Sequence, residues 1–489
     1  MLHDQVEGNL NHSSVDVEMR QIQEERSNER EDDVTSVGHH SASVMPEPPN
    51  GWRRDVKDPS LPEHYARIAV ANQNASFRKK IGSFSGIGFL IAVCYMDPGN
   101  WATDVAGGAS FGYDLLFIIL ISSLTAMFLQ FLSLKLGIAA QRDLAQACRD
   151  SFHPKVVFLL WIIMEIAIIA TDMAELLGAA IALYLMTSLP LPAGVAVTCI
   201  DVFFILIFQS RNLRILEVIV AVLTFVIFIL LLFLTIKSNP NWGQVFRGLV
   251  PTGSIFTNPN ELFVAIGVIG ATVMPHSLFL HSALVQSRGY ERTLEGKKFA
   301  KFYGALDSNI SLTFAFFVNS FLLILSAAAF HATEPNTSDL MQAYKLLSPL
   351  IGTQGANVLF GIALLASGEQ ASLVGTIAGQ VIMEGLIDFK IVPWKRRLLT
   401  RAIALIPCLI ITIIMGSQSV QLLILSQVIL SITLPFAIIP LVMITSNKTK
   451  MGADFVNSRF TTTVGCLIAV IITGLNLYIL TSADTWNLS

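Results

Sequence analysis

Three side chains that suit a metal ion lie beside two prolines within apolar segments of the chain. Asp97 and Asn100 belong to the sequence DPGN in the first segment, and Met274 belongs to the sequence MPH in the second. Asp97 offers a hard carboxylate oxygen, Asn100 a neutral amide oxygen and Met274 a soft thioether. A helix that is interrupted at each proline would add free backbone carbonyls near Cys94 and Ala271.

This set of donors indicates a site for a divalent transition-metal ion. Calcium and magnesium sites are built from oxygen ligands alone, whereas sulfur favours softer metals. We therefore expect Mn²⁺ or Fe²⁺, with Co²⁺, Zn²⁺ and Cd²⁺ as further candidates. The competing interpretation of Met274 is packing, which is the usual role of a methionine in an apolar helix. Its position directly before the second proline favours the role of a ligand.

Two groups beside these prolines could also carry protons. A carboxylate that faces a dication is expected to be deprotonated, so Asp97 would hold a proton only when the metal is absent. His276 titrates in the useful range, although a structural histidine is an equally good interpretation. Met274, His281 and Arg288 recur every seven residues and predict one helical stripe that descends toward the cytosolic end.

Three acidic side chains are predicted to share one face of another apolar segment. Glu165, Asp172 and Glu175 are spaced i, i+7 and i+10, and exposing all three to lipid would cost about 9 kcal/mol. They must therefore face protein or water. The available cationic partners are the arginines near the cytosolic ends of two other segments, namely Arg288, Arg397 and Arg401. A proton relay and a salt-bridged gate are both compatible with this pattern, and both remain open.

The composition places these segments in a membrane. Of the 489 residues, 53% are hydrophobic and 14% are charged, and the mean hydropathy is +0.62. Runs long enough to cross about 30 Å of hydrocarbon predict eleven spans. They lie at about 84–107, 113–136, 156–186, 190–209, 215–236, 259–286, 305–330, 353–387, 400–415, 418–443 and 460–481.

Basic residues indicate which side of the bilayer each connection faces. If the N-terminus is cytosolic, 19 Lys and Arg residues fall in cytosolic connections and 3 fall in connections on the opposite side. We therefore expect a multi-pass protein in the lipid bilayer, with a cytosolic N-terminus and the C-terminus on the other side. The sequon at Asn336 lies in an outer connection, where it is either a glycosylation site or a chance triplet.

Residues 1–80 differ from the rest in composition, because 24 of them are charged and none forms an apolar signal segment. We expect a cytosolic, mostly disordered tail, followed by a membrane domain at 81–489. A formal net charge of −3 gives no support to nucleic-acid binding. Five scattered cysteines without a CxxC pair are predicted to be apolar filler rather than zinc ligands.

The two proline-containing spans are the first and the sixth, which is the pattern of an inverted repeat of five helices. Both helices are predicted to break at mid-membrane, with the binding site between the breaks. Repeat one then covers about 84–236, repeat two covers about 259–443, and 460–481 is an extra helix. The competing interpretation, that each proline merely kinks its helix, is weakened by the matching positions and the polar residues at both.

Four motifs resemble those of a known family. DPGNWATD, GATVMPH, ATDMAE and KRRLLTR are similar to the motifs of the natural resistance-associated macrophage protein family of metal-ion transporters. The likeness covers the chain from about Phe84 to about Leu480, and the paired DPGN and MPH motifs are highly specific. It implies the leucine-transporter-like fold and inward transport of manganese or iron with protons by alternating access. Metal and protons are then substrates, and no cofactor is implied.

The resemblance also assigns roles to individual residues. It implies that Asp97, Asn100 and Met274 bind the metal through their side chains, and that the carbonyls of Cys94 or Ala271 complete the shell. Gln427 would be a ligand or a gate contributor in one state, and Gln130 looks like the family's outer-gate glutamine. Proton handling falls to the ionisable residues Asp97, His276, Glu165, Asp172 and Glu175.

Three positions depart from the family pattern. Ser277 follows MPH where asparagine is common, Cys94 replaces the usual alanine, and Glu369 places an acid where a neutral polar residue is expected. None of them changes the side chains of Asp97, Asn100 and Met274. The intact methionine argues against relatives that are specialised for magnesium or aluminium.

Two other function classes compete with metal transport. A membrane-embedded metal or hormone sensor would need a soluble signalling domain, and the polar tail has no recognisable core for one. A sodium-coupled amino-acid carrier would hold a substrate carboxylate at the broken helices, where Asp97 would repel it. An enzyme has no support, because no nucleophile-base constellation or phosphate loop occurs.

Overall fold

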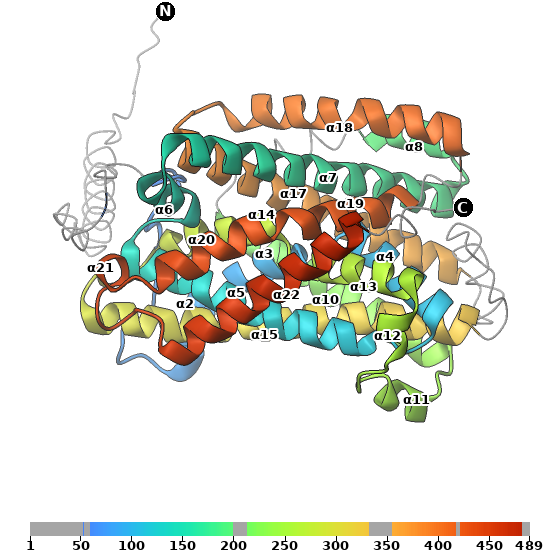
Figure 1. Cartoon of the computed structure of the whole chain (residues 1–489), viewed down its shortest axis with the longest axis horizontal. Coiled ribbons are helices and arrows are strands. Elements are labelled where there is room, and N and C mark those ends of the chain that lie inside the picture. Colours follow the sequence, from blue (N-terminus) through green and yellow to red (C-terminus); the bar gives the residue numbers. More distant parts are fainter. Residues whose placement is uncertain (1–51, 53–58, 199–212, 332–354, 417–420, 482–489) are drawn as a thin grey trace, which may run out of the picture. The chain divides into compact units, whose positions relative to one another are not determined.

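The computed structural model describes residues 52, 59–198, 213–331, 355–416 and 421–481. Within these residues, nine helical segments are long and apolar enough to cross a membrane. The expected tail residues 1–51 and 53–58 and the sequon at Asn336 lie outside the described residues. The part of the chain that can be followed is almost entirely helical (Figure 1).

The helices and strands fall into two sets along the chain. The first set is β1 (Ile68–Ala69), α2 (Phe77–Phe84), α3 (Ile87–Val93), α4 (Pro98–Phe111), α5 (Leu116–Ala140), α6 (Leu144–Ser151), α7 (Pro154–Thr187), α8 (Leu191–Val197), α10 (Leu213–Lys237), α11 (Trp242–Arg247) and α12 (Ser254–Thr257). The second set is α13 (Pro259–Thr272), α14 (Pro275–Leu284), η2 (Val285–Ser287), β2 (Arg288–Gly289), α15 (Leu294–Ser326), η3 (Ala327–His331), α17 (Ala356–Ile387), α18 (Pro393–Met415), α19 (Gln421–Thr433), α20 (Pro435–Thr445), α21 (Lys448–Met451) and α22 (Arg459–Thr481).

The predicted architecture of eleven spans with two broken helices is confirmed. The first span is the pair α3 and α4, each too short to cross alone, and the sixth is the pair α13 and α14. The fourth span begins as α8, and its remainder at 199–209 lies outside the described residues. The other spans correspond to the remaining long helical segments, although α18 begins at Pro393 rather than near residue 400.

Prolines and capping side chains determine where several helices begin. A proline at the first helical position loses no hydrogen bond, because that N–H has no partner within the helix. Asp97 caps α4 by accepting the backbone N–H of Asn100 at 2.9 Å, and Asn258 caps α13. The helices that open with proline are α4, α7, α13, α14, α18 and α20, starting at Pro98, Pro154, Pro259, Pro275, Pro393 and Pro435. Within a membrane span, such a start separates two shorter helices.

The tenth span contains a third interruption that we did not predict. α19 ends at Thr433, and α20 begins at Pro435 after the single residue Leu434. Pro435 lacks an N–H to donate to the preceding helix, but Leu434 keeps helical φ and ψ and accepts from the N–H of Ile438 at 3.1 Å, so this interruption bends the span instead of unwinding it. Its apolar neighbours hide the break in a hydropathy profile.

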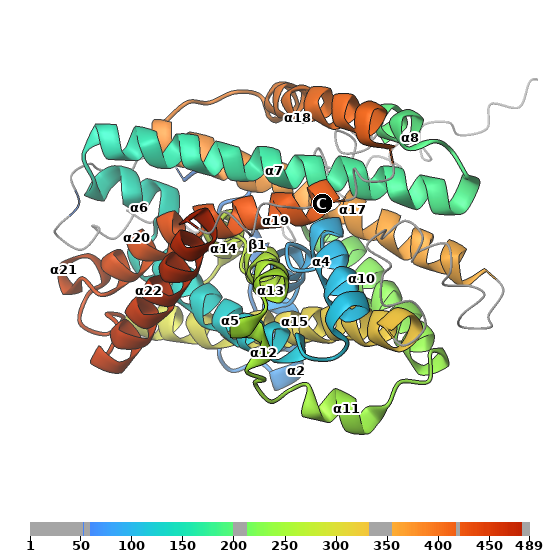
Figure 2. The same ribbon diagram turned by 45° about the vertical axis from the view of Figure 1, so that its right-hand side comes forward.

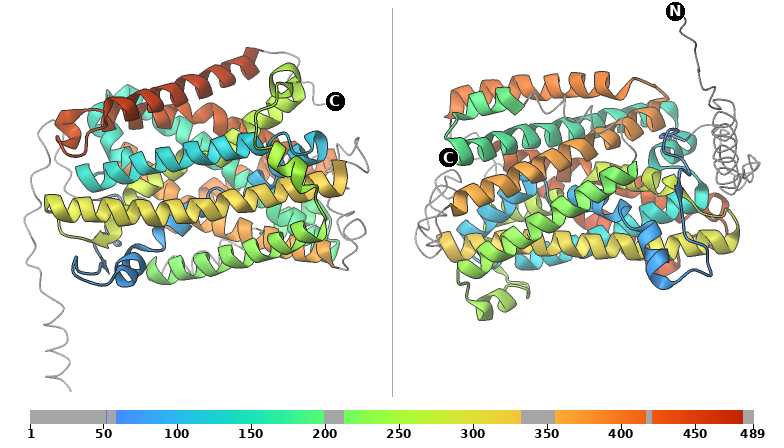
Figure 3. Two further views of the ribbon diagram at one scale, coloured as in Figure 1. Left: turned by 90° about the horizontal axis from the view of Figure 1, so that it is seen from below. Right: turned by 180° about the vertical axis from the view of Figure 1, so that it is seen from behind.

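The long helices pack against one another through close backbone approaches. α7 lies beside α17 and α18 along one edge in Figure 1, and α8 lies beside α18 in Figure 2. α22 packs on α20 at the periphery, as Figure 3 shows, and much of its surface is exposed, as suits an added helix. Pro98 contacts Gly178 of α7 and Gly368 of α17, where any added Cβ would collide with or crowd its ring. The broken first span is therefore held against two long helices.

Part of the segment that we expected to be a disordered tail is ordered. Residues 59–66 form a turn, Ile68 and Ala69 pair in parallel with Arg288 and Gly289, and α2 begins at Phe77. Sequence composition alone could not reveal this order, because the stabilising partners lie more than 70 residues away in the chain.

Gly86 lies at the N-terminus of α3 with φ of 121°, a conformation that L side chains rarely adopt. A Cβ added there would also approach Glu217 Oε2 to 2.5 Å. We expect Gly86→Ala to lower the free energy of unfolding by about 1–3 kcal/mol, measured by thermal unfolding in detergent. Gly82→Ala is the matched control, because a Cβ at Gly82 meets nothing within 4 Å. Equal stability of the two variants would contradict the expectation.

Candidate metal site

The break in the first span places Asp97 at the start of α4. The backbone N–H groups of residues 94–96 donate to carbonyls three residues earlier at 2.9–3.1 Å, so the chain tightens before the helix stops. Asp97 is fully buried at this break. Its Oδ1 accepts hydrogen bonds from the backbone N–H of Asn100 at 2.9 Å and from the Asn100 Nδ2 at 2.6 Å.

The two breaks meet at the Asn100 amide. Asn100 Nδ2 donates both to Asp97 Oδ1 and to the backbone carbonyl of Ala271, at 3.0 Å for the latter. Two acceptors, one from each broken helix, thus converge on one buried electropositive group. A rotated amide would present Oδ1 instead of Nδ2, and then carboxylate, carbonyl and amide oxygens would all face a shared point. Met274 lies three residues after Ala271 and immediately before α14.

The site is enclosed from several sides by described residues. Asp97, Asn100, Ala271, Met274 and Cys94 are at most 3% exposed. Enclosure of a carboxylate without an arginine or lysine partner is costly, unless a cation or a proton balances the charge.

Gln427 of α19 covers the same region. A Cβ added to Gly99 would overlap the Gln427 side chain, and one added to Gly270 would collide with the Gln427 carbonyl. Gln427 therefore touches the beginning of α4 and the end of α13. Gln427 Oε1 and Asp97 Oδ2 are both buried and have no hydrogen-bond partner among the described residues. Two buried oxygen atoms with unused lone pairs fit a cation-binding site.

Side chains from α4 itself and from two other helices bind further carbonyls at the first break. Asn319 of α15 donates to the carbonyl of Tyr95 at 2.9 Å. The Met96 carbonyl accepts from Trp101 Nε1 at 2.9 Å and from the hydroxyl of Ser367 in α17. These residues were not predictable from the sequence, because an isolated Asn or Ser in an apolar span does not identify its partner. These hydrogen bonds pair the carbonyls of the unwound backbone, for which lipid offers no donors.

A second polar network lies next to the metal-site residues. Gln130 of α5 donates to the Tyr95 hydroxyl at 2.6 Å and to the Ser277 hydroxyl at 2.7 Å, and its Oε1 lies 2.9 Å from His281 Nδ1. Ser277, which replaces the usual asparagine, donates to the Met274 carbonyl at 2.7 Å. The departure is therefore accommodated within the network.

The partners of Gln130 bear on its expected role as an outer-gate residue, which stays a prediction. Its partners belong to the end of α3 and to α14, which are the halves of the broken spans predicted to face the cytosol. A residue of an outer gate would contact α4 or α13 instead. Gln130 and His281 thus separate the candidate site from the predicted cytosolic side, and Gln427 stands on the other side.

The acidic face of α7 is paired with arginines of α18. Arg397 binds both Asp172 and Glu175, the latter at 3.0 Å, and Arg401 binds Glu175 at 3.1 Å. Glu165 pairs at 3.0 Å with Arg396, a partner that we did not predict. Three buried polar atoms in this region have no hydrogen-bond partner among the described residues, namely Asp172 Oδ2, Glu175 Oε1 and His276 Nδ1.

Arg288 does not serve the acids of α7, contrary to our expectation. It donates to Glu217 of α10 at 2.8 and 3.1 Å, and to the carbonyls of Phe84 and Ser85 before α3. The predicted stripe also ends early, because α14 stops at Leu284 and Arg288 lies in β2. Together with Asp307, which accepts the N–H groups at the start of α3, this cluster anchors the first half-helix.

No group of three or more His, Cys, Asp or Glu side chains in the described part of the chain could hold a metal ion. Cys148 and Cys408 are buried, Cys466 is exposed, and Cys199 lies outside the described residues. Glu369 is half-buried within α17. The mixed donor set at the breaks is thus distinct from a conventional resident-metal centre.

The two interrupted helices and the buried site between them define a multi-pass membrane transporter with a leucine-transporter-like fold. Mhp1, a nucleobase-cation-symport-1 family transporter, is 13% identical with a TM-score of 0.55, covering 83% of this chain and 94% of its own. MhsT, solved in complex with L-phenylalanine, is 17% identical with a TM-score of 0.55, covering 82% and 98%. At these identities the likeness shows the fold alone.

The chain belongs to the natural resistance-associated macrophage protein-like family, whose model matches residues 88–482. The divalent metal cation transporter MntH of Nostoc sp. is 49% identical over 86% of this chain and 96% of its own length. MntH of Listeria innocua is 48% identical over 88% and 96%. The crystal structure of the Eremococcus coleocola manganese transporter with an aromatic bis-isothiourea compound is 42% identical, with a TM-score of 0.80, covering 86% and 91%.

Replacing Arg397 should leave two buried carboxylates without their shared cation. We expect Arg397→Gln to lower the free energy of unfolding by about 3–5 kcal/mol, measured by thermal unfolding in detergent. A second change, Asp172→Asn, should restore part of that loss, because it removes the carboxylate left without an ion-pair partner, whereas Glu175 keeps Arg401. The exposed Arg459→Gln is the control. An Arg397→Gln protein as stable as this control would refute a stabilising role for the cluster.

Proposed function

We propose that this chain imports divalent transition-metal ions, Mn²⁺ and Fe²⁺ above all, into the cytosol together with protons. The observation that carries the proposal is the convergence of Asp97 Oδ1 and the Ala271 carbonyl on one buried point. Membership of the family and the names of the relatives support the same cargo class. Co²⁺, Zn²⁺ and Cd²⁺ are further cargo of the same chemistry.

The proposed ligands combine hard and soft donors. Asp97 and a rotated Asn100 amide supply side-chain oxygens, the carbonyls of Ala271 and Cys94 supply backbone oxygens, and Met274 supplies sulfur. Gln427 adds an oxygen while α19 covers the site. A single thioether weakens the competition from Ca²⁺, which binds oxygen ligands, and leaves Mn²⁺ and Fe²⁺ favoured.

The proposed proton path runs from the site to the acids of α7. Binding of a dication displaces any proton from Asp97, because a metal ion and a proton on the same carboxyl group repel each other strongly in a buried site of low dielectric constant. His276 Nδ1 and Asp172 Oδ2 are both buried and have no hydrogen-bond partner among the described residues. His276, Asp172 and Glu175 then offer successive proton acceptors, and Glu165 lies farther along the same helix. Arg396 pairs with Glu165, and Arg397 pairs with Asp172 and Glu175.

The proposed transport cycle alternates access to this site. Gln427 closes the site toward the side that the topology assigns to the exterior, and Gln130 with His281 closes it toward the cytosol. Arg288 and Glu217 hold the first half-helix on the cytosolic side. Opening one set while the other remains closed would carry the ion across. In this topology the N-terminus is cytosolic and the C-terminus lies outside.

Uptake of Mn²⁺ into proteoliposomes under an inward proton gradient tests the metal site. We expect Asp97→Ala to abolish uptake, because the site loses its only carboxylate. Met274→Ala should retain uptake but become sensitive to excess Ca²⁺, since the remaining ligands are oxygens. Met164→Ala, which removes a buried methionine of α7, controls for lost packing.

Two outcomes would sink the metal site. The first is Mn²⁺ uptake that Asp97→Ala leaves intact. The second is a folded wild-type protein that takes up no Mn²⁺, which would return the sensor and other-substrate interpretations to consideration. Identical Ca²⁺ sensitivity of Met274→Ala and Met164→Ala would remove the thioether from the selectivity mechanism.

Proton movement can be tested separately with a pH-sensitive dye inside the proteoliposomes. We expect Mn²⁺ entry to acidify the lumen, and Glu175→Gln to lower the number of protons that enter with each Mn²⁺, because the path loses an acceptor. Glu261→Gln is the control, since this buried acid at the start of α13 lies off the path. An unchanged ratio in Glu175→Gln would show that the acid serves only its arginines.

A further inference from the structure

Residues 59–70 form an ordered segment, which we call the strap, six residues upstream of α2. It lies before the residues that match the family model, which begin at 88. Leu61 is buried in the main hydrophobic core, whereas its neighbours Pro62 and Glu63 are exposed. The strap is therefore bound by specific contacts on one of its sides.

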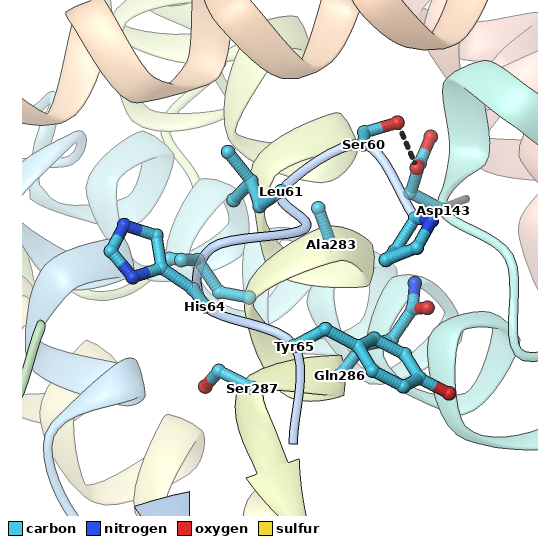
Figure 4. Close-up of a pocket in the computed structure, with 10 residues that line it drawn as sticks. Ser60, Leu61, His64, Tyr65, Asp143, Ala283, Gln286 and Ser287 are labelled. Carbon is cyan, nitrogen blue, oxygen red and sulfur yellow. Dashed lines mark hydrogen bonds between the residues drawn. The ribbon is translucent and has the colours of Figure 1, made fainter. Parts of the chain in front are cut away.

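One end of the strap is bound to the connection between α5 and α6. The Ser60 hydroxyl donates to Asp143 Oδ2 at 2.6 Å, as Figure 4 shows. Asp143 Oδ1 caps α6 by accepting the N–H of Gln146 at 2.9 Å. Burial raises the pKa of the Asp143 carboxyl, and the Ser60 hydrogen bond opposes that rise. The Tyr65 hydroxyl reaches Gln141 Oε1 at 3.4 Å in the same connection.

The other end of the strap is bound to the segment that follows α14. The N–H of Ala66 donates to the Gln286 carbonyl at 3.0 Å, and β1 then pairs with β2 through Ile68 and Arg288. Arg288 itself holds Glu217 and the carbonyls before α3. The strap thus adds a strand beside the residue that anchors the first half-helix.

A small cavity lies between the strap and the end of α14. It is lined by Ser60, Leu61, His64 and Tyr65 of the strap, and by residues from the other two elements (Figure 4). The remaining lining includes Asp143 before α6 and Ala283, Gln286 and Ser287 at the end of α14. The strap therefore contacts both the residue before α6 and the end of α14.

The geometry points to a latch: the docked strap holds the cytosolic side closed, and its release from Asp143 and β2 permits the first half-helix to open. This inference rests on the alternating access proposed above. The strap leads through residues 71–76 and α2 to α3, and it pairs with Arg288, which binds the carbonyls of Phe84 and Ser85 just before α3. Movement of α3 is therefore opposed while residues 60–69 stay bound. Docking of the strap and closure of the cytosolic side are then one equilibrium.

A cysteine reporter can measure this closure without any cargo. Ser311 of α15 is fully buried, and its hydroxyl has no hydrogen-bond partner among the described residues. A Cβ added to Gly88 of α3 would approach Ser311 Oγ to 2.7 Å, so Ser311 lies behind α3. In a background with the five native cysteines replaced, maleimide labelling of Ser311→Cys should report movement of α3.

The disrupting variant is Ser60→Asp, which places a second carboxylate against Asp143. We expect labelling of the reporter to become about tenfold faster, the effect of losing one charge-assisted hydrogen bond on a two-state equilibrium. Ala69→Asp adds the same charge to an exposed position of the strap and should leave labelling unchanged. Elution as a single species in size-exclusion chromatography verifies that each variant is folded.

A tether provides the opposite test. Ser60→Cys combined with Asp143→Cys, oxidised to a disulfide in the cysteine-replaced background, should fix the strap in place. We expect Mn²⁺ uptake to fall at least about tenfold on oxidation and to recover on reduction. The single variant Ser60→Cys, treated in the same way, is the control.

The outcomes separate the latch from the proposed cargo. Unchanged labelling of the Ser311→Cys reporter in a folded Ser60→Asp protein would overturn the latch, as would full uptake by the tethered protein. Faster labelling together with an absence of Mn²⁺ uptake in wild type would support the latch and reject the metal as cargo. Faster labelling in Ser60→Asp together with reversible loss of Mn²⁺ uptake in the tethered protein would support both the latch and the proposed cargo.

Discussion

The constraint on which this structure depends is the cost of an unpaired backbone group in hydrocarbon. Two spans stop at mid-membrane because Pro98 and Pro275 cannot continue the helices before them. The carbonyls released at the first break are taken up by Asn319, Ser367 and Trp101. Each of these donors comes from a different helix, so the break can exist only inside the assembled bundle.

The same constraint explains how the polar groups are distributed around the site. One side of the breaks is closed by Gln427 and the other by Gln130 and His281. Neutral amides and an imidazole suit these positions, because they exchange hydrogen-bond partners without leaving a bare charge. The charged pairs lie farther away, between α7 and α18 and between Arg288 and Glu217.

Sequence was informative wherever a residue type acts alone. A proline interrupts a helix in any surroundings, and an acid in an apolar span needs a partner, so the breaks and the acidic face of α7 were predictable. The identity of each partner was not. Arg288 was assigned to the acids of α7 but pairs with Glu217, and Glu165 pairs with Arg396 instead, because helix packing rather than spacing decides which side chains meet.

The strap and the third break could not be predicted from the sequence, for different physical reasons. The strap has the polar composition of a disordered tail, and its order comes from Asp143 and β2 far along the chain. The break between α19 and α20 lies in a continuous apolar run, where a proline that opens a helix looks like one that kinks it. The partners of Gln130, at the end of α3 and in α14, could not be predicted because its neighbours in sequence do not show which half-helices it contacts.

The Asn100 amide has a consequence for the part of a transport cycle in which nothing is carried. Its Nδ2 donates at once to the carboxylate of Asp97 and to the carbonyl of Ala271, the two acceptors proposed to bind the ion. An internal donor thus stands in for the departed cargo and supplies part of its positive potential. For a carrier that must return empty before it can work again, such a substitute lowers the electrostatic barrier to resetting, and rotation of one amide exchanges the placeholder for the ligand.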